Sequence, residues 1–340
     1  MDRLDVEIIR LLHYAPWEFS GASESDILKR RPSIYWIYNT IAEEIKTGKL
    51  QIEHNGISKS YIIGRIQKVG NSLTVRANID GRALELEEFR VMVYGSPSSL
   101  DGISFEDSCF ASVNTVHRGL FMDGKGNFTS AASIEFFQKD QKEMEAHLSR
   151  VREHHPELGI ALYGRKFPPP SESMKERYRK LRSYDGKLRK GVRTVLSEII
   201  KDPTSRINTI STNTGLSRAH VKKFFLEIAR SGMITMEPTQ INSLVFDSTI
   251  AVLLVKCPFQ EKNGVNRRLL SETVLGERMI LERESEEDTL VYLAWSTGYP
   301  DMYTIYNEVA NLMGADKVQL AVQAKTYQNT QGIIRMINNS

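Results

Sequence analysis

The sequence is poor in cysteine and has no long apolar run. Its 340 residues include only Cys109 and Cys257, which lie far apart in the chain. Two distant cysteines give neither a disulfide framework nor a CxxC redox or metal pair, and no apolar run approaches the roughly 20 residues needed to span a bilayer. The opening MDRLDVEIIRLL has acids inside its apolar pattern, which is not typical of a signal peptide. We therefore expect a cytoplasmic protein that is not associated with a membrane.

Net charge is also small, at +3, but the basic residues are unevenly distributed. The stretch 165–193 holds eleven Lys or Arg residues against three acids, so it carries the whole positive excess. Such a block can neutralise nucleic-acid phosphates, and it can equally be a solvated linker. At roughly 150 residues per domain, the chain length predicts two or more domains.

A catalytic or metal-binding constellation is missing as well. The seven histidines form no ligand set, since His154 and His155 are adjacent at a predicted helix end with no HxxxH or cysteine partner near them in sequence. Residues 119–126 fit GxxxxGK but end in Gly126, where a phosphate loop needs Ser or Thr. A hairpin turn is the better interpretation of that segment. We expect no catalytic residue, no metal and no cofactor.

What the chain does contain is an internal repeat with a shift of 184 positions. Its matched positions are spaced mainly by three and four, the period of an amphipathic helix, so both copies are predicted to hold the same three helices. The shift places Leu4 on Leu188, Ile8 on Val192, Leu12 on Leu196, Ser33 on Ser217, Ile37 on Val221, Ile41 on Phe225 and Gly48 on Gly232.

The second copy carries the signals of a winged helix-turn-helix. We predict helices over 187–201, 207–214 and 217–231. Gly215 supplies a left-handed helix stop and Ser217 an N-cap for the next helix, and a short Gly-containing turn between helices is typical of this motif. The extended stretch after the last helix is the predicted wing.

Each helical copy is followed by a pattern of short strands and helices. Alternation in the order βαββαβ predicts a ferredoxin-like α+β domain in each half. The elements are strand 89–94, helix 105–113, strands 119–123 and 128–136, helix 139–154 and strand 159–166, then strand 249–256, helix 265–275, strands 278–283 and 289–296, helix 301–313 and strand 318–327. Residues 60–81 of the first half are extra, and we interpret them as a β-hairpin with its tip at 69–72.

The predicted fold class is therefore α+β, with two winged helix-turn-helix domains and two ferredoxin-like domains in tandem. The boundaries are 1–57 for the first winged helix-turn-helix, 58–83 for the inserted hairpin and linker, 84–167 for the first α+β domain, 168–186 for a basic linker, 187–241 for the second winged helix-turn-helix and 242–340 for the second α+β domain.

This pattern resembles the Lrp/AsnC family of leucine-responsive, feast/famine transcriptional regulators. The resemblance is carried by Leu4, Asp5, Ile8, Leu11 and Leu12 at the start of the chain, by Gly215-Leu216-Ser217 and by the exit Arg230-Ser231-Gly232-Met233-Ile234. It implies double-stranded DNA as partner, a small-molecule effector such as an amino acid at the interface of the α+β (RAM) domains, and a homodimer or an intrachain pseudo-dimer. The sequence departs from the family in carrying two units per chain.

The resemblance also locates candidate DNA-binding residues, because a recognition helix places its N-terminal residues against base edges. In the second copy the candidates are Ser217, Arg218, His220 and Lys222 for the bases, with Lys223 and Arg230 for phosphates. The first copy lacks the Gly-Leu-Ser turn, and its aromatic helix favours a packing role for the first helix-turn-helix. Its candidates are Lys29, Arg30, Arg31, Ser33, Tyr35 and Asn39.

We predict a sequence-specific DNA-binding transcriptional regulator that is not an enzyme, and we keep two alternatives. The same architecture resembles siroheme decarboxylases, tetrapyrrole enzymes that include fused two-unit forms, although the histidine-bearing segments expected after the relevant strands are not seen. The second alternative is a DNA-coating protein without sequence preference, which the basic linker supports.

Overall fold

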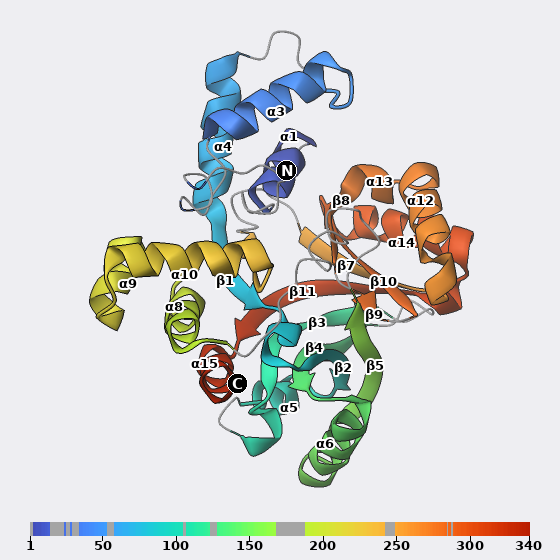
Figure 1. Ribbon diagram of the computed structural model, residues 1–340. Coiled ribbons are helices and arrows are strands. Elements are labelled where there is room, and N and C mark those ends of the chain that lie inside the picture. Colours follow the sequence, from blue (N-terminus) through green and yellow to red (C-terminus); the bar gives the residue numbers. More distant parts are fainter. Residues whose placement is uncertain are drawn as a thin grey trace.

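The structure is a computed structural model that describes residues 3–13, 24, 28, 34–52, 58–104, 107–122, 128–167, 188–241, 249–283, 285–286 and 288–340. Two helical groups flank a large curved sheet that carries further helices (Figure 1). No helix in these ranges is long and apolar enough to cross a membrane.

The first helical group contains α1 (Arg3–His13), α3 (Ile34–Lys46) and α4 (Lys59–Ser72). The repeat positions Ile8, Ile37 and Ile41 are fully buried between these helices. Gly48 follows α3 with a φ of +73°, a left-handed conformation that glycine adopts at little cost. The amphipathic spacing therefore predicted the core of this group correctly.

Helix α4 corrects the hairpin prediction for residues 60–81. Ile62, Ile66 and Val69 are buried on one side of α4, at the spacing of four and three that a helix requires. The predicted hairpin tip at 69–72 is the last turn of this helix. The hairpin interpretation was wrong because it relied on the turn preference of the Gly and Asn residues. The helical spacing of the apolar residues in the segment was the better guide.

The second helical group contains α8 (Lys190–Lys201), α9 (Ile207–Thr214) and α10 (Arg218–Ser231), followed by strand β6 (Ile234–Ile241). Gly215 ends α9 with a φ of +71°, and the Ser217 hydroxyl caps α10 by accepting from the His220 N–H at 3.3 Å. Gly232 has a φ of +74° after α10, matching Gly48 in the first copy. The predicted caps and turns of this group are confirmed.

Both α+β units have the predicted βαββαβ order. We use "first unit" for 87–167 and "second unit" for 249–328. The first unit comprises β2 (Glu87–Tyr94), α5 (Pro97–Asp101), η3 (Ser108–Phe110), β3 (Val113–Met122), β4 (Phe128–Gln138), α6 (Gln141–His154) and β5 (Gly159–Phe167). The second comprises β7 (Thr249–Lys256), α12 (Lys262–Glu272), α13 (Leu275–Arg278), β8 (Met279–Arg283), β10 (Thr289–Ser296), α14 (Tyr299–Met313) and β11 (Val318–Gln328).

Their strand orders, β3-β4-β2-β5 and β8-β10-β7-β11, are the same permutation of the sequence order. The predicted fold class is confirmed. One element is displaced: the helix expected over 105–113 is replaced by the short α5, which begins at the cap Ser96 and Pro97, and by the single turn η3. Ser followed by Pro is a helix-start signal that the sequence analysis did not use.

The two units share one sheet. Strand β11 of the second unit pairs antiparallel with β3 of the first, with Thr326 opposite His117. At the other end, β5 pairs with β9 (Ser285–Glu286), which lies in the connection between β8 and β10. Within the described residues, the nine-strand order therefore begins at β8 and ends at β9, so the two ends of the sheet are neighbours in the chain.

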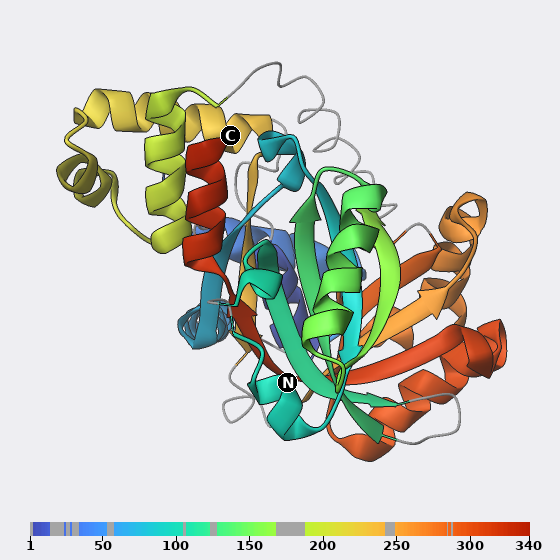
Figure 2. The ribbon, with the colours of Figure 1, turned by 90° about the horizontal axis from the view of Figure 1, so that it is seen from below.

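Each helical group packs on the opposite half of the chain. The core of the first group includes Trp295 of the second unit, and Arg10 of α1 donates to the Met279 carbonyl at 3.0 Å. The core of the second group includes Phe137 of the first unit and residues of the final helix α15 (Thr330–Asn339), which lies beside α8 (Figure 2). Strand β1 (Leu73–Ile79) pairs with β6 where the two halves cross.

Candidate functional site

The sheet has a helix-covered face and a second face that both units share. Along β2, Phe89, Val91 and Val93 alternate into the core beneath α6. Because successive side chains of a strand point to opposite faces, Arg90 and Met92 lie on the other face. Both of these residues line a cavity there.

The cavity is a partly open hollow with a volume of about 30 Å³, well below the several hundred Å³ of a typical small-molecule site. Its wall is mostly apolar, and strands of both units contribute to it. The lining residues are Arg90, Met92, Arg118, Gly119, Phe121 and Ser133 from the first unit and Val252, Leu254, Val291, Ala321 and Val322 from the second.

A buried ion pair lies at this cavity. Arg90 and Glu135 are cross-strand neighbours on β2 and β4, with Arg90 Nη2 3.4 Å from Glu135 Oε1. Arg90 is 4% exposed and Glu135 is fully buried. A buried charge is costly unless it is paired, so each side chain stabilises the ionised form of the other in this position.

A second arginine extends the polar cluster. Arg76 of β1 is buried and donates to the Thr115 hydroxyl at 2.9 Å, and Thr115 lies opposite Glu135 in the β3–β4 register. These four side chains hold two cations and one anion.

Arg118 has a different role, although it contributes to the cavity lining. It lies opposite Ala132, which belongs to the helix-side core. Its guanidinium forms an ion pair with Asp101 of α5 and lies 5.0 Å from the centre of the Tyr327 ring. Of the two arginines in the lining, Arg90 is therefore the one whose side chain lies on the cavity side of the sheet.

The equivalent wall of the second unit is apolar. The β2–β4 register sets Arg90 opposite Glu135, and the β7–β10 register sets Val252 opposite Leu293 at the corresponding place. The cavity therefore has one wall with buried charge and one wall of aliphatic side chains.

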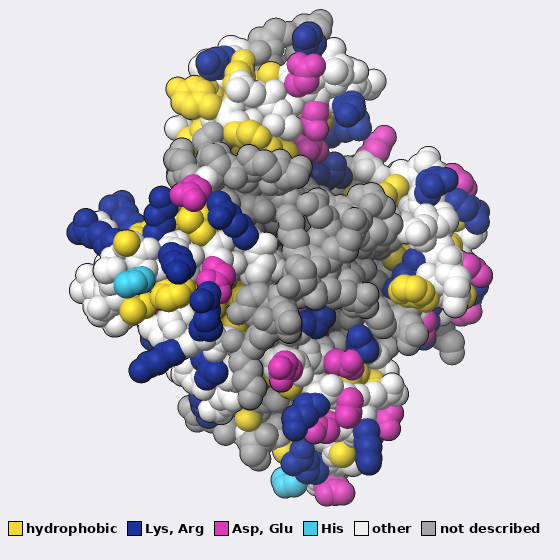
Figure 3. Space-filling model, viewed as in Figure 1, with side chains coloured by type: hydrophobic (Ala, Val, Ile, Leu, Met, Phe, Trp, Pro, Cys, Tyr) yellow, Lys and Arg dark blue, Asp and Glu magenta, His cyan; other side chains and the backbone are white. Residues whose placement is uncertain are grey.

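The six DNA-binding candidates of the second copy all lie on the surface of α10 or at its start. Ser217, Arg218, His220, Lys222, Lys223 and Arg230 are exposed, and Lys and Arg side chains gather over α9 and α10 in Figure 3. Two of them contact an acid of the first half: Glu24 lies 3.0 Å from Lys222 Nζ and 3.6 Å from Arg230 Nη2. The hydrogen bond from Lys222 is the main cause that lowers the pKa of the Glu24 carboxyl.

The candidates of the first copy are only partly described. Tyr35 and Asn39 are exposed on α3, and Lys59 Nζ lies 5.4 Å from the Tyr35 ring centre. Lys29, Arg30, Arg31 and Ser33 lie outside the described residues, as does the predicted basic linker 168–186.

Sequence reasoning missed Arg90 and Glu135. Each stands between apolar residues of a predicted strand, in FRVMV and SIEFF. A charged residue inside a strand that is buried on both faces is itself a signal, because such a charge is almost never buried without a partner. The signal needed two strands to be compared, and only the fold makes them neighbours.

The architecture defines a class of protein with two helix-turn-helix groups and two α+β units sharing a sheet. A scan against models of protein families finds no match, and a search of curated proteins finds none. The solved structures include a similar chain, the crystal structure of the siroheme decarboxylase NirDL, with a TM-score of 0.51 and 10% identity over 99% of this chain and 98% of that chain. The same enzyme in co-complex with an iron-uroporphyrin III analogue matches with a TM-score of 0.43 and 9% identity over 98% of each chain.

The first match contradicts the expectation that this chain is not an enzyme. That expectation came from assigning the duplicated architecture to transcriptional regulators. A solved enzyme has the same architecture, and the match covers nearly the whole chain. The DNA-binding regulator, predicted as the main function, gains no support from the comparisons.

Proposed function

We propose that this chain is a tetrapyrrole-binding enzyme of the siroheme decarboxylase kind, with its substrate in the cavity between the two units. One observation carries the proposal: a buried arginine, Arg90, at the wall of an otherwise mostly apolar cavity built by both units. The fold match with a siroheme decarboxylase supplies the substrate class. Siroheme is a flat iron tetrapyrrole whose edge carries carboxylates.

In this proposal the residues bind and orient the substrate. Val252, Leu254 and Val291 contact the face of the macrocycle, and the Arg90 guanidinium holds a carboxylate of its edge. Decarboxylation breaks the bond between the carboxylate carbon and its neighbour, releases CO2 and leaves an electron pair that takes up a proton. An apolar cavity favours this step, because the charged carboxylate loses hydration that neutral CO2 does not need.

Siroheme titration of the full chain, followed by absorbance and by mass spectrometry of the extracted tetrapyrrole, tests the proposal. We expect saturable one-to-one binding and a product lighter by the mass of CO2. Arg90→Lys keeps the charge but loses the bidentate geometry, and should weaken binding. Arg165→Lys should not, because Arg165 of β5 lies in a partly exposed ion pair with Glu87 of β2. Absence of siroheme binding by the folded wild-type chain would exclude the function.

A second candidate function, DNA binding through α10, is favoured by the exposure of all six predicted contacts on that helix. Its test is selection from random duplexes at fixed salt, comparing wild type with the double variant Arg218→Ala plus Lys222→Ala. Enrichment of one site, lost in the variant, supports a regulator. Equal affinity for all sequences supports the DNA-coating alternative, and no binding excludes both.

We also keep, as predictions, a cytoplasmic location, the amino-acid effector and the homodimer or pseudo-dimer implied by the family resemblance. Neither Cys109 nor Cys257 is in a disulfide, in keeping with a reducing compartment. Mass measurement in solution distinguishes a monomeric pseudo-dimer from a homodimer.

A further inference from the structure

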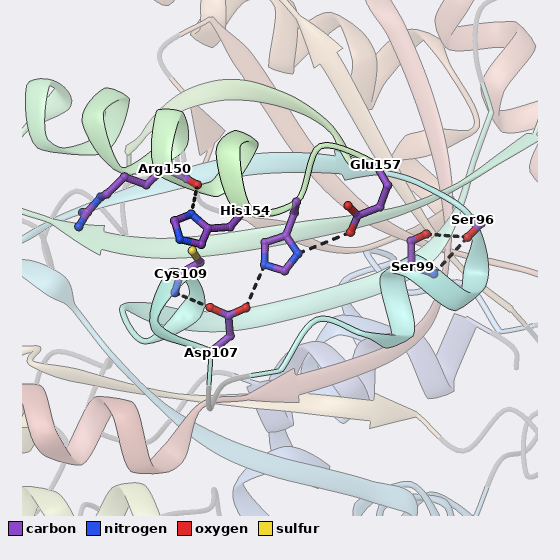
Figure 4. A network of polar contacts seen from close by, with 8 residues as sticks. Ser96, Ser99, Asp107, Cys109, Arg150, His154 and Glu157 are labelled. Carbon is purple, nitrogen blue, oxygen red and sulfur yellow. Dashed lines mark hydrogen bonds and ion pairs between the residues drawn. The ribbon is translucent and has the colours of Figure 1, made fainter.

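A cluster of metal-ligand side chains lies on the helix-covered side of the first unit, on the other face of the sheet from the cavity. Asp107 and Cys109 come from the turn η3 and its cap (Figure 4). His155 directly follows α6. One carboxylate oxygen, the Cys109 Sγ and a ring nitrogen of His155 all lie within 4.8 Å of one another. Cys109 and His155 are far apart in sequence, and only the fold brings them together.

Backbone and side-chain contacts hold the three groups in place. Asp107 Oδ1 accepts from the Cys109 N–H at 2.8 Å, so its other oxygen, Oδ2, is directed to His155 Nε2 at 2.9 Å. Cys109 is buried in the core beneath α6, and Asp107 and His155 are half-buried. The hydrogen bond from the Cys109 N–H is the largest of the causes that lower the pKa of the Asp107 carboxyl.

A fourth residue occupies the position expected of an outer-sphere carboxylate. Glu157 Oε1 lies 3.5 Å from His155 Nδ1, the ring nitrogen turned away from Asp107. In metal sites the second nitrogen of a histidine ligand almost always donates to such a group, which fixes the ring and its tautomer. The centre of the Phe110 ring lies 5.4 Å from the centre of the His155 imidazole, so Phe110 restricts the movement of the imidazole on another side.

We propose that Asp107, Cys109 and His155 bind a zinc ion, with Glu157 accepting from the Nδ1–H of the histidine ligand. A thiolate, an imidazole and a carboxylate are the ligand types that zinc takes, and three protein ligands leave one of its four positions for water. Binding displaces the thiol proton and the Nε2 proton to solvent. The ion joins η3 to the end of α6, and so links the start of β3 to the turn before β5.

Cobalt substitution tests the site, because Co2+ bound by a thiolate gives a sulfur-to-metal absorption band. The full chain, stripped with a chelator, is titrated with CoCl2 and then with ZnCl2. We expect one equivalent of Co2+ with the thiolate band, displaced by Zn2+. Cys109→Ser and His155→Ala should abolish the band. Cys257→Ser, the buried cysteine of the second unit, and His154→Ala, the exposed neighbouring histidine, should leave it unchanged.

Glu157→Gln keeps all three ligands and the fold, and should weaken Zn2+ binding roughly tenfold or more. It therefore decides the case if Cys109→Ser does not fold. The proposal is overturned by absence of the thiolate band in the folded wild-type chain, by a band that survives in His155→Ala, or by equal Zn2+ affinity in Glu157→Gln and wild type.

Discussion

At the residue scale, the Arg90–Glu135 pair combines a stability cost with a binding role. The chain contains its own apolar counterpart, because Val252 and Leu293 occupy the corresponding positions of the second unit. Replacement of a buried ion pair by apolar residues is often neutral or stabilising, whereas removal of one partner strands a buried charge. The two effects can therefore be separated by mutation.

We predict that Glu135→Leu lowers the free energy of unfolding by about 3–5 kcal/mol, because Arg90 loses its buried partner. The double variant Arg90→Val plus Glu135→Leu, which copies the second unit, should recover most of that loss in urea unfolding. It should nevertheless bind siroheme more weakly than wild type. A double variant no more stable than the single one would contradict this account of the pair.

His147 on α6 gives the chain a dependence on pH. Burial is the main cause that lowers the pKa of this imidazole from 6.5, and Arg150 acts in the same direction. Its Nε2 donates to the Cys109 carbonyl at 2.8 Å, so Nδ1 is left as the acceptor facing Arg150 Nη2 at 3.4 Å. The folded state therefore holds the neutral form.

The unfolded chain takes up this proton at higher pH than the folded chain. The contribution of neutral His147 to the free energy of unfolding is therefore full above pH 6.5 and falls as the pH drops below it. His147→Gln keeps a donor for the carbonyl but does not titrate. We would measure melting temperatures from about pH 7.5 to about pH 5, a range that spans the ordinary pKa of histidine. The melting temperature should fall less steeply with decreasing pH in this variant than in wild type. His154→Gln, exposed at the end of the same helix, should have the wild-type slope, and parallel slopes for wild type and His147→Gln would disprove the assignment.

The sequence predicted the exposure of side chains better than their contacts. All six α10 candidates are on the surface, as a recognition helix requires, because amphipathic spacing separates its exposed positions from its buried ones. Arg90 and Glu135 were not predicted, and neither was the meeting of Cys109 with His155. Those pairs depend on strand register and on a loop path, which no local pattern in the chain encodes.

At the element scale, the left-handed glycines mark where the helices of each copy end. Gly215 has a φ of +71° with open space around its Cβ position, so any cost of a side chain there comes from the backbone alone. Gly64 lies exposed within α4 with similar open space and no positive φ. The two positions are a matched pair.

We predict opposite effects of alanine at these positions. Gly215→Ala should destabilise the chain by about 1–2 kcal/mol, the cost of left-handed backbone for an L-residue. Gly64→Ala should stabilise it by about 0.5–1 kcal/mol, because glycine inside a helix costs conformational entropy. Denaturant midpoints measure both, and a stabilising Gly215→Ala would show that the turn is not left-handed in solution.

Element type was predictable wherever one period dominated. Strands β7 and β10 match their predicted ranges because their apolar runs are short and bounded. Helix α4 was misassigned because the glycines and Asn71 of KSYIIGRIQKVGNS favour turns locally, while burial against α1 and α3 decides for a helix. Tertiary packing overrides local preference in such segments.

At the scale of the whole molecule, the two halves are joined by three strand pairings, β1 with β6, β3 with β11 and β5 with β9, and by the crossed packing of the helical groups. Each helical group completes its core with residues of the other half. The connection through residues 168–187 is therefore not needed to hold the halves together.

We predict that a chain cut at a protease site inserted into 168–187 keeps its halves associated. Under native conditions both fragments should elute as one species with the hydrodynamic size of the uncut chain, because the shared sheet and crossed cores persist. The same sample in denaturant should separate. Two native peaks would mean that the linker, and not the sheet, keeps the halves together.

The unlike walls of the cavity follow from having both halves in one polypeptide. In a homodimer, a two-fold axis would force every residue that faces the ligand to appear twice, so an arginine on one side would bring a second on the other. Fusion removes that constraint, and here one half has Arg90 with Glu135 where the other has Val252 with Leu293. Such a chain can evolve one orientation for a ligand whose two edges differ, and it can lose function in one copy of a duplicated element without losing it in both.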